Sequence, residues 1–121
     1  MTERQREILD AARRLLEREG VEALTVGRLA AALSIKPPSL YKHFAGKREL
    51  EAHLIAEGLR EHAAALEAAG GDLASIAAAY RAFALANPQL YRLMTERPLP
   101  REDLPAGLED RAAAPLLAAL D

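Results

Sequence analysis

Two short helical patterns with a tight connection constrain the fold more than any other feature of this sequence. Thr25 is a suitable N-cap for a helix over Val26–Leu33. The pair Pro37-Pro38 follows after only a few residues, and proline is favoured at the first position of a helix. The next helix is therefore expected to begin within this pair and to end at His43 or Phe44.

The remainder of the chain predicts further helices and no strand, because Ala, Leu, Arg and Glu dominate and no alternating pattern occurs. Capping residues, glycines and prolines mark the ends of these helices. We expect helices over residues 2–19, 47–68, 73–86 and 88–95, a loop over 97–105, and a last helix from about residue 107, which Pro115 kinks or divides in two.

These elements predict an all-α chain with two domains. Residues 1–46 form a three-helix domain, and the long fourth helix joins it to a small helical domain over residues 47–121. Helical spacing predicts the inward side chains of the fourth helix as Leu50, Leu54, Leu59, Ala63 and Leu66. The same spacing predicts a buried stripe on the fifth helix, formed by Leu73, Ile76, Ala77, Tyr80, Phe83 and Ala84.

Charge is distributed unevenly, although the net charge is only −2. Residues 25–48 carry no acidic side chain and five basic ones, namely Arg28, Lys36, Lys42, Lys47 and Arg48. A local positive patch on an acidic protein is suited to phosphate. The alternative is a chance cluster of charges on a solvated helix face.

The second short helix fits the requirements of a recognition helix. A helix that enters the major groove is short, anchored by a few apolar residues and polar on its other face. Leu40 and Phe44 supply the anchors, four residues apart, so that Ser39, Lys42 and His43 cannot all be buried. An ordinary helical bundle that happens to contain two short helices remains the alternative.

Other functional classes have less support. The chain has no cysteine and no apolar run long enough to span a membrane, and its first residues do not resemble a secretory signal, so we expect a cytoplasmic protein without membrane attachment. No catalytic motif or cofactor loop is present. Glu49, His53 and Glu57 share one helix face and raise the possibility of a metal site, but His62 is the only other histidine nearby and a solvated face is favoured.

Six short motifs follow one another between residues 8 and 54: Ile8-Leu9-Asp10-Ala11-Ala12, Glu19-Gly20, Leu24-Thr25-Val26, Leu29-Ala30, Ser39-Leu40-Tyr41-Lys42-His43-Phe44 and Gly46-Lys47-Arg48-Glu49-Leu50. In their order and spacing, these residues resemble the N-terminal DNA-binding domain of the TetR family of bacterial regulators. The chain departs from the family in having Ser34 where a glycine is usual, and in having Lys36 and a proline pair at the start of the next helix.

The resemblance implies double-stranded DNA as a partner and assigns roles within the site. It places Thr25 and Lys47 on phosphates, which suits a capping hydroxyl and a lysine. It directs four residues to bases, namely Lys36, Pro37, Pro38 and Ser39, and three to backbone or bases, namely Tyr41, Lys42 and His43. Tyr41 as a half-buried core residue and His43 as a packing residue remain alternatives.

The C-terminal half resembles, more weakly, a TetR subgroup with a Trp-His-Gly signature, although no tryptophan is present and the chain ends sooner than is typical. We therefore expect either a shortened second domain or a dimer that is built differently. The resemblance implies a repressor that forms a homodimer and is released by an unknown small-molecule effector, in a pocket with Leu59, Tyr80, Phe83, Tyr91 and Met94 as candidate lining. The alternatives are that these residues form core and that the chain is a helical protein–protein module with a degenerate helix-turn-helix.

Overall fold

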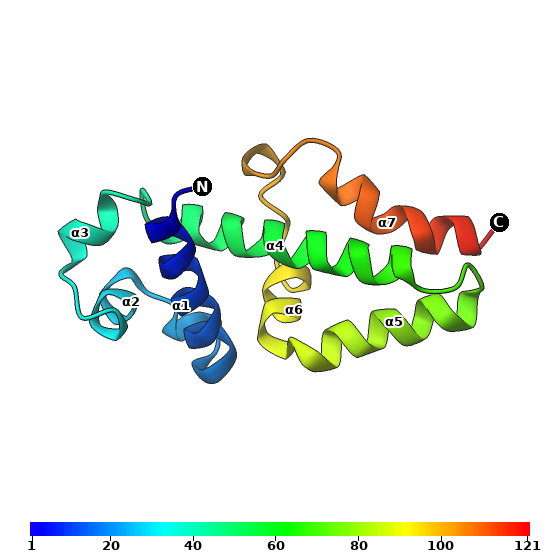
Figure 1. The fold of residues 1–121 in the computed structure, drawn as a ribbon, viewed down its shortest axis with the longest axis horizontal. Helices are drawn as coiled ribbons and strands as arrows, with labels where there is room; N and C mark the ends of the chain where they lie inside the picture. Colours follow the sequence, from blue (N-terminus) through cyan, green and yellow to red (C-terminus); the bar gives the residue numbers. More distant parts are fainter. The chain divides into compact units, whose positions relative to one another are not determined.

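The computed structural model describes residues 1–121 as an all-helical chain, which confirms the predicted fold class (Figure 1). The chain divides into two compact units, residues 1–54 and 55–121, with the boundary inside the long helix α4. The α-helices are α1 (Glu3–Glu19), α2 (Val26–Ala32), α3 (Pro37–Tyr41), α4 (Lys47–Ala68), α5 (Leu73–Ala86), α6 (Pro88–Thr95) and α7 (Leu108–Ala119), with short 3₁₀ turns η1 (Val21–Ala23) and η2 (Arg101–Asp103).

Helix α1 is defined by signals at both of its ends. The Thr2 hydroxyl accepts a hydrogen bond from the Gln5 backbone N–H, and the Gln5 side chain accepts one from the Thr2 N–H, which forms a capping box. Gly20 ends the helix with φ 90°, a conformation that favours glycine. Between these ends, α1 contributes to the core of the first unit with Ile8, Leu9, Ala11, Ala12, Leu15 and Leu16.

The connection between α2 and α3 depends on Ser34, which adopts a left-handed conformation with φ 57°. This conformation lets the Ile35 N–H donate to the Ala30 carbonyl at 3.0 Å, so the end of α2 is closed by the backbone alone. Serine here takes the conformation that glycine adopts more easily. Helix α3 ends at Tyr41, earlier than predicted, and the His43 N–H donates to the Leu40 carbonyl at 2.9 Å in a tighter final turn.

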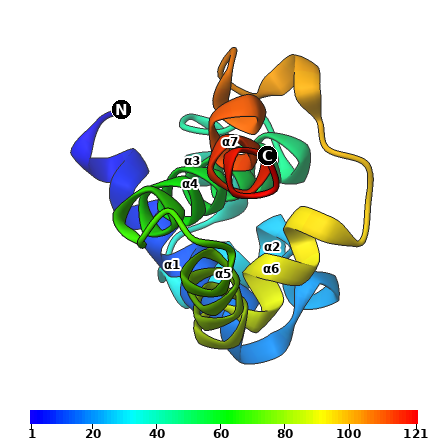
Figure 2. The same ribbon diagram turned by 90° about the vertical axis from the view of Figure 1, so that its right-hand side faces the viewer.

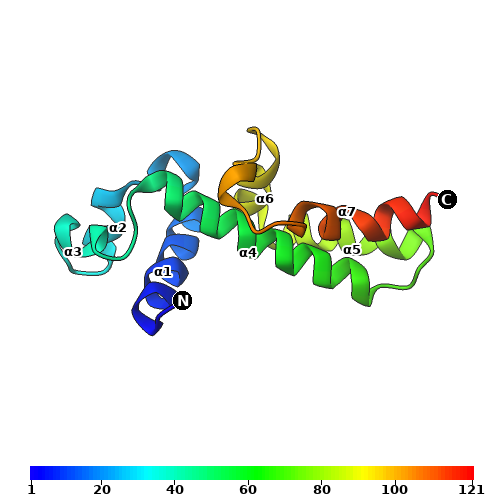
Figure 3. The same ribbon diagram turned by 90° about the horizontal axis from the view of Figure 1, so that it is seen from above.

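The second unit consists of the C-terminal part of α4 with α5, α6 and α7 (Figure 2). Helix α7 runs beside α4 (Figures 1 and 3), where Arg111 donates two hydrogen bonds to Glu67 at 2.8 and 2.7 Å. Gly58 permits a close approach of α6, because a Cβ atom there would lie 2.6 Å from the Met94 Sδ and 3.2 Å from a Leu90 methyl. All five predicted inward side chains of α4 are buried.

The buried stripe of α5 differs from the prediction. Ile76 and Phe83 are buried, but Leu73 is 47 % exposed and Ala77 is also exposed. These two residues lie at one edge of the predicted stripe, and the helix buries only the other edge, which is centred on Ile76 and Phe83. The predicted loop over 97–105 contains the turn η2, and α7 continues through Pro115 as one helix.

Candidate nucleic-acid interface and ligand cavity

Helix α3 buries its two predicted anchors and exposes the rest of its surface. Leu40 is 1 % and Phe44 2 % exposed, and the Phe44 ring meets the His53 ring edge-to-face at 5.3 Å. The exposed residues of this segment, which we call the α3 face, are Lys36, Pro37, Pro38, Ser39, Tyr41 and Lys42. Because both anchors are buried, this face is held firmly by the core of the first unit.

The start of α3 offers almost no free backbone donor. Pro37 and Pro38 occupy its first two positions and carry no N–H, and the Ser39 N–H donates to the Lys36 carbonyl at 2.9 Å. Lys36 is the N-cap residue, but its side chain makes no capping hydrogen bond. Recognition at this end of the helix therefore depends on side chains.

The cations around α3 differ in whether they have an acidic partner. Arg28 donates a hydrogen bond to Glu19, so part of its charge is neutralised within the protein. Lys36, Lys42 and Lys47 form no ion pair. These three lysines are available to an external anion such as phosphate.

Thr25 and Lys47 lie at the starts of α2 and α4, the helices that precede and follow α3 in the sequence. The Thr25 hydroxyl accepts from the Arg28 N–H at 3.1 Å, which leaves its own proton free to donate to a phosphate oxygen. At the start of α4, the Glu49 carboxylate accepts from the Ala45 N–H at 2.7 Å. Because Glu49 adds a negative charge to the first turn of α4, a side-chain cation such as Lys47 is what suits an anion there.

Tyr41 and His43 are placed differently. Tyr41 is 52 % exposed, so the structure does not place it in the core. His43 is half-buried, and its carbonyl accepts a hydrogen bond from the Gln5 side chain at 3.2 Å. Gln5 therefore links the start of α1 to the end of α3, a contact that our sequence analysis missed, because a capping residue does not reveal a long-range partner.

The second unit contains a cavity of about 230 Å³ among α4, α5, α6 and α7. Four of the five predicted pocket residues line it, namely Leu59, Tyr80, Tyr91 and Met94. Phe83 is buried beside it, with its ring 5.1 Å from the His62 ring. The sequence analysis missed the remaining lining residues, which are His62, Leu66, Thr95, Glu109, Ala112, Ala113 and Leu116.

His62 had a detectable signal, because it lies on the apolar face of α4 between Leu59 and Leu66. Burial lowers the pKa of His62, which favours its neutral form. Across the cavity lining, the hydroxyls of Tyr80 and Tyr91 are 3.3 Å apart. This hydrogen bond, together with burial, raises the pKa of Tyr80 to about 12, so that the hydroxyl stays protonated.

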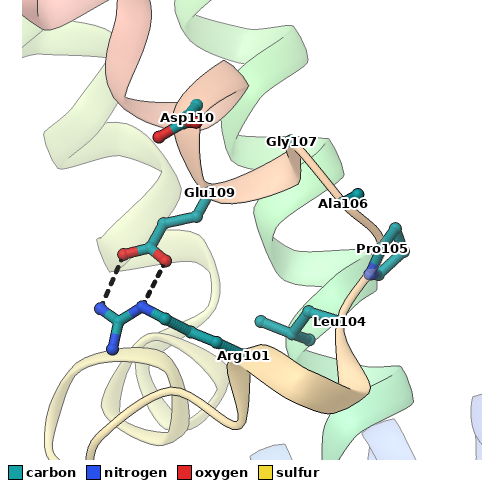
Figure 4. A pocket seen from close by; sticks show the side chains of 7 residues that line it. All are labelled: Arg101, Leu104, Pro105, Ala106, Gly107, Glu109 and Asp110. Carbon is teal, nitrogen blue, oxygen red and sulfur yellow. Dashed lines mark hydrogen bonds and ion pairs between the residues drawn. The ribbon is translucent and has the colours of Figure 1, made fainter.

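Glu109 is the only acidic group that lines the cavity. Arg101 donates to its carboxylate at 2.7 and 2.8 Å and lowers its pKa (Figure 4). The same pair borders a smaller hollow of about 160 Å³ at the start of α7, lined also by Leu104, Pro105, Ala106, Gly107 and Asp110. The charge of Glu109 is therefore already compensated within the second unit.

The candidate metal ligands of α4 lie along the helix surface. The His53 Nε2 is 3.9 Å from a Glu49 carboxylate oxygen, and no group of three potential metal-ligating side chains is present. No helix has the length and apolar character that crossing a membrane requires.

Two short helices joined by a tight turn and anchored against α1 define a helix-turn-helix domain. Residues 8–54 match the family model described as bacterial regulatory proteins of the tetR family, and residues 73–121 match the tetracycline repressor-like C-terminal domain. The chain belongs to the TetR family.

Relatives with this arrangement include two bacterial proteins named as uncharacterized HTH-type transcriptional regulators. YobS of Bacillus subtilis is 36 % identical over 93 residues, which cover 72 % of this chain and 49 % of YobS. Rv0681 of Mycobacterium tuberculosis is 32 % identical over 120 residues, covering 93 % of this chain and 55 % of Rv0681. The chain thus spans about half the length of these relatives.

A solved structure has a closely similar fold over almost the whole chain. The crystal structure of SCO4313, a protein assigned a regulatory role, superposes with a TM-score of 0.73 at 34 % identity. The match covers 94 % of this chain and 58 % of SCO4313. The fold of both units is therefore one that SCO4313 also adopts.

Proposed function

We propose that this chain is a sequence-specific DNA-binding regulator of transcription that acts in the cytoplasm and has no catalytic role. The observation that carries this proposal is the α3 face, an exposed helix surface with three unpaired lysines on and beside it. A helix of this kind fits the major groove, where side chains reach base edges.

Within this proposal the site residues divide by the kind of contact they make. Lys36, Pro37, Pro38 and Ser39 lie at the start of α3 and face bases, whereas Thr25 and Lys47 hold phosphates. Tyr41, Lys42 and His43 meet the backbone or bases. The exposure of Tyr41 and Lys42 supports this division, and so does the free proton of the Thr25 hydroxyl.

We also propose that the chain is a repressor released by a small molecule bound in the cavity of the second unit. Helix α4 runs without a break from Lys47 to Ala68, so the same helix carries a proposed phosphate contact and lines the cavity. Release requires an effector with different affinities for the two states of the protein. The repressor-like C-terminal match supports this direction of regulation.

A single short recognition helix binds weakly, and we therefore propose a homodimer. Two recognition helices that read one operator are separated by one helical turn of DNA, about 34–36 Å, or a multiple of it. Light scattering of the 121-residue chain at tens of micromolar measures its assembly. A monomer at that concentration would contradict dimerisation of this chain.

The experiment that tests DNA binding begins with selection of a DNA sequence from a random library by the purified chain. Fluorescence anisotropy then compares the selected duplex with a scrambled duplex over a series of salt concentrations. We expect preference for the selected duplex and an affinity that falls steeply with salt, by a log–log slope of about 0.9 per phosphate contact. Failure to enrich any sequence, with no salt dependence, would favour the protein–protein module instead.

A further inference from the structure

A residue that lines the cavity has one buried polar atom without a partner within the protein. His62 is only 6 % exposed, and its Nδ1 is buried without a hydrogen bond. Its ring is held edge-to-face by Tyr80 and Phe83, with centroids at 4.6 and 5.1 Å. Buried polar atoms in native proteins nearly always have a partner, so an unpaired one in a residue that lines a cavity points to an occupant.

The polar groups of the cavity supply both donors and acceptors. A neutral imidazole has one N–H donor and one acceptor nitrogen. In the Tyr80–Tyr91 pair, one hydroxyl donates to the other, which leaves the second hydroxyl a proton for another acceptor. The occupant that matches these groups carries a hydroxyl, because a hydroxyl both donates and accepts.

The charges around the cavity favour a neutral occupant. No lysine or arginine lines it, and its one carboxylate, Glu109, is already paired with Arg101. An anion would find no cation here and would lie near that carboxylate. A cation would have to compete with Arg101, and in either case a desolvated ion without a partner is costly.

The size and walls of the cavity favour a single ring. An apolar cavity of about 150 Å³ in another protein holds one benzene molecule. At about 230 Å³, the present cavity has room for a ring with a few further atoms. The rings of Tyr80 and Tyr91 and the thioether of Met94 are favourable neighbours for an aromatic ligand.

We propose that the cavity binds a small neutral phenol, whose ring lies among the apolar side chains and whose hydroxyl hydrogen-bonds to His62 and the Tyr80–Tyr91 pair. This inference rests on the proposed effector role of the cavity and names the chemical class of the effector. His62 then determines specificity, because its bond distinguishes a phenol from the same ring without a hydroxyl.

The test uses three probes that share one methyl-substituted ring: p-cresol, toluene and 4-methylbenzoate. Isothermal titration calorimetry measures their binding to the full chain in the absence of DNA. We expect p-cresol to bind about five- to tenfold more tightly than toluene, which corresponds to the free energy of one net hydrogen bond. We expect 4-methylbenzoate to bind most weakly of the three. No binding of p-cresol at millimolar concentration, equal affinities, or a preference for the anion would overturn the proposal.

Variants separate recognition from packing. His62→Leu keeps a side chain of similar bulk, and we expect it to remove most of the preference for p-cresol over toluene. Tyr91→Phe removes one hydroxyl and should reduce the same ratio by less. The matched control His53→Leu changes a partly exposed histidine of the first unit in the same way and should leave the ratio unchanged. An unchanged ratio in His62→Leu would show that His62 only packs, and would overturn its role.

The same materials distinguish this inference from the proposed function. If p-cresol binds with the expected preference but does not weaken binding to the selected DNA, the ligand class stands and release by this class of ligand is wrong. If the chain binds p-cresol but no DNA, the ligand class again stands and the DNA-binding proposal is wrong. If DNA binding is normal and no probe distinguishes the hydroxyl, the inference alone is wrong.

Discussion

The core of residues 1–54 holds more completely buried large side chains than the core of residues 55–121. In the first unit nine large side chains are at most 2 % exposed, namely Ile8, Leu9, Leu16, Leu24, Leu29, Leu40, Phe44, Leu50 and Leu54. The second unit, although it is the longer one, has four such side chains, namely Leu66, Ile76, Leu90 and Leu93. The second unit retains a cavity of about 230 Å³, which Ala112 and Ala113 of α7 line with short side chains.

This difference matches the two proposed tasks. A recognition helix must hold its side chains in a fixed geometry, and a core packed to native density resists displacement. A receptor for a small molecule needs unfilled space with a few polar groups. We therefore infer that the first unit is the rigid part of the protein and that the second unit is the part that accepts a ligand.

The largest effect on stability should come from truncating a buried leucine to alanine in each of the two cores. Leu40→Ala opens a cavity in a filled core, and we expect it to lower the free energy of unfolding of the first unit by about 4 kcal/mol. Leu59→Ala enlarges a space that already exists, and we expect a loss nearer about 2 kcal/mol. Native-state hydrogen exchange measures the two units separately. Equal losses would contradict the difference in packing.

Replacing a buried alanine with leucine should change the stability of the two units in opposite directions. Ala12 is completely buried in α1, so Ala12→Leu overpacks the first core and should cost about 1–3 kcal/mol. Ala112 lines the cavity, so Ala112→Leu fills it and should stabilise the second unit by about 0.5–2 kcal/mol. Denaturant unfolding gives the sign for each variant. Destabilisation of similar size by both would mean that the cavity does not tolerate added atoms.

Acid should weaken the second unit through His62. Because burial lowers the pKa of His62, the unfolded chain binds its proton more readily than the folded one. The contribution of neutral His62 is fully present above the unfolded pKa of about 6.5 and is lost as the pH falls from there through the folded pKa. The slope for one proton is at most about 1.4 kcal/mol per pH unit.

This pH dependence is measured by the unfolding of the wild type and of His62→Leu between pH 7.5 and 5, where Glu109 stays ionised because Arg101 lowers its pKa. His62→Leu should lack the slope, whereas His53→Gln, which changes a partly exposed histidine of the first unit, should retain it. The same slope in the wild type and His62→Leu would assign the proton to another group.

The smallest effect concerns the turn before α3. Ser34→Gly should stabilise the first unit by about 0.5–1 kcal/mol, because the left-handed conformation at φ 57° strains a serine and not a glycine. The control Ala31→Gly, in the helical part of α2, should destabilise by a similar amount. A loss of stability in Ser34→Gly would indicate that the serine is not strained there.

The starts of the helices were predictable because their causes are local. Caps, prolines and glycines at Thr25, Pro37, Asp72 and Pro88 mark helix starts that the structure confirms within about a residue. The exposure of Leu73 was not predictable, because periodicity locates an apolar stripe but does not say which edge a neighbouring helix covers.

The two candidate sites also differ in how much of each can be predicted from local sequence. The DNA-binding residues are adjacent in sequence, so a local motif and a family resemblance were enough to nominate them. The cavity draws on α4, α5, α6 and α7, and residues such as Glu109 and Leu116 join it only through the tertiary fold. The lone polar residue on an apolar helix face, His62, was the one further signal that the sequence offered.

The most direct measurement compares Lys36→Ala with Lys47→Ala on the selected and scrambled duplexes over a salt series, with Arg81→Ala of the second unit as the control. We expect Lys36→Ala to lose about 1–3 kcal/mol on the selected duplex and to relax the preference at one base position. Lys47→Ala should weaken both duplexes equally and lower the salt slope by about one. Affinities equal to the wild type in both variants would contradict DNA recognition by the first unit, and exchanged phenotypes would mean that α3 enters the groove at a different rotation.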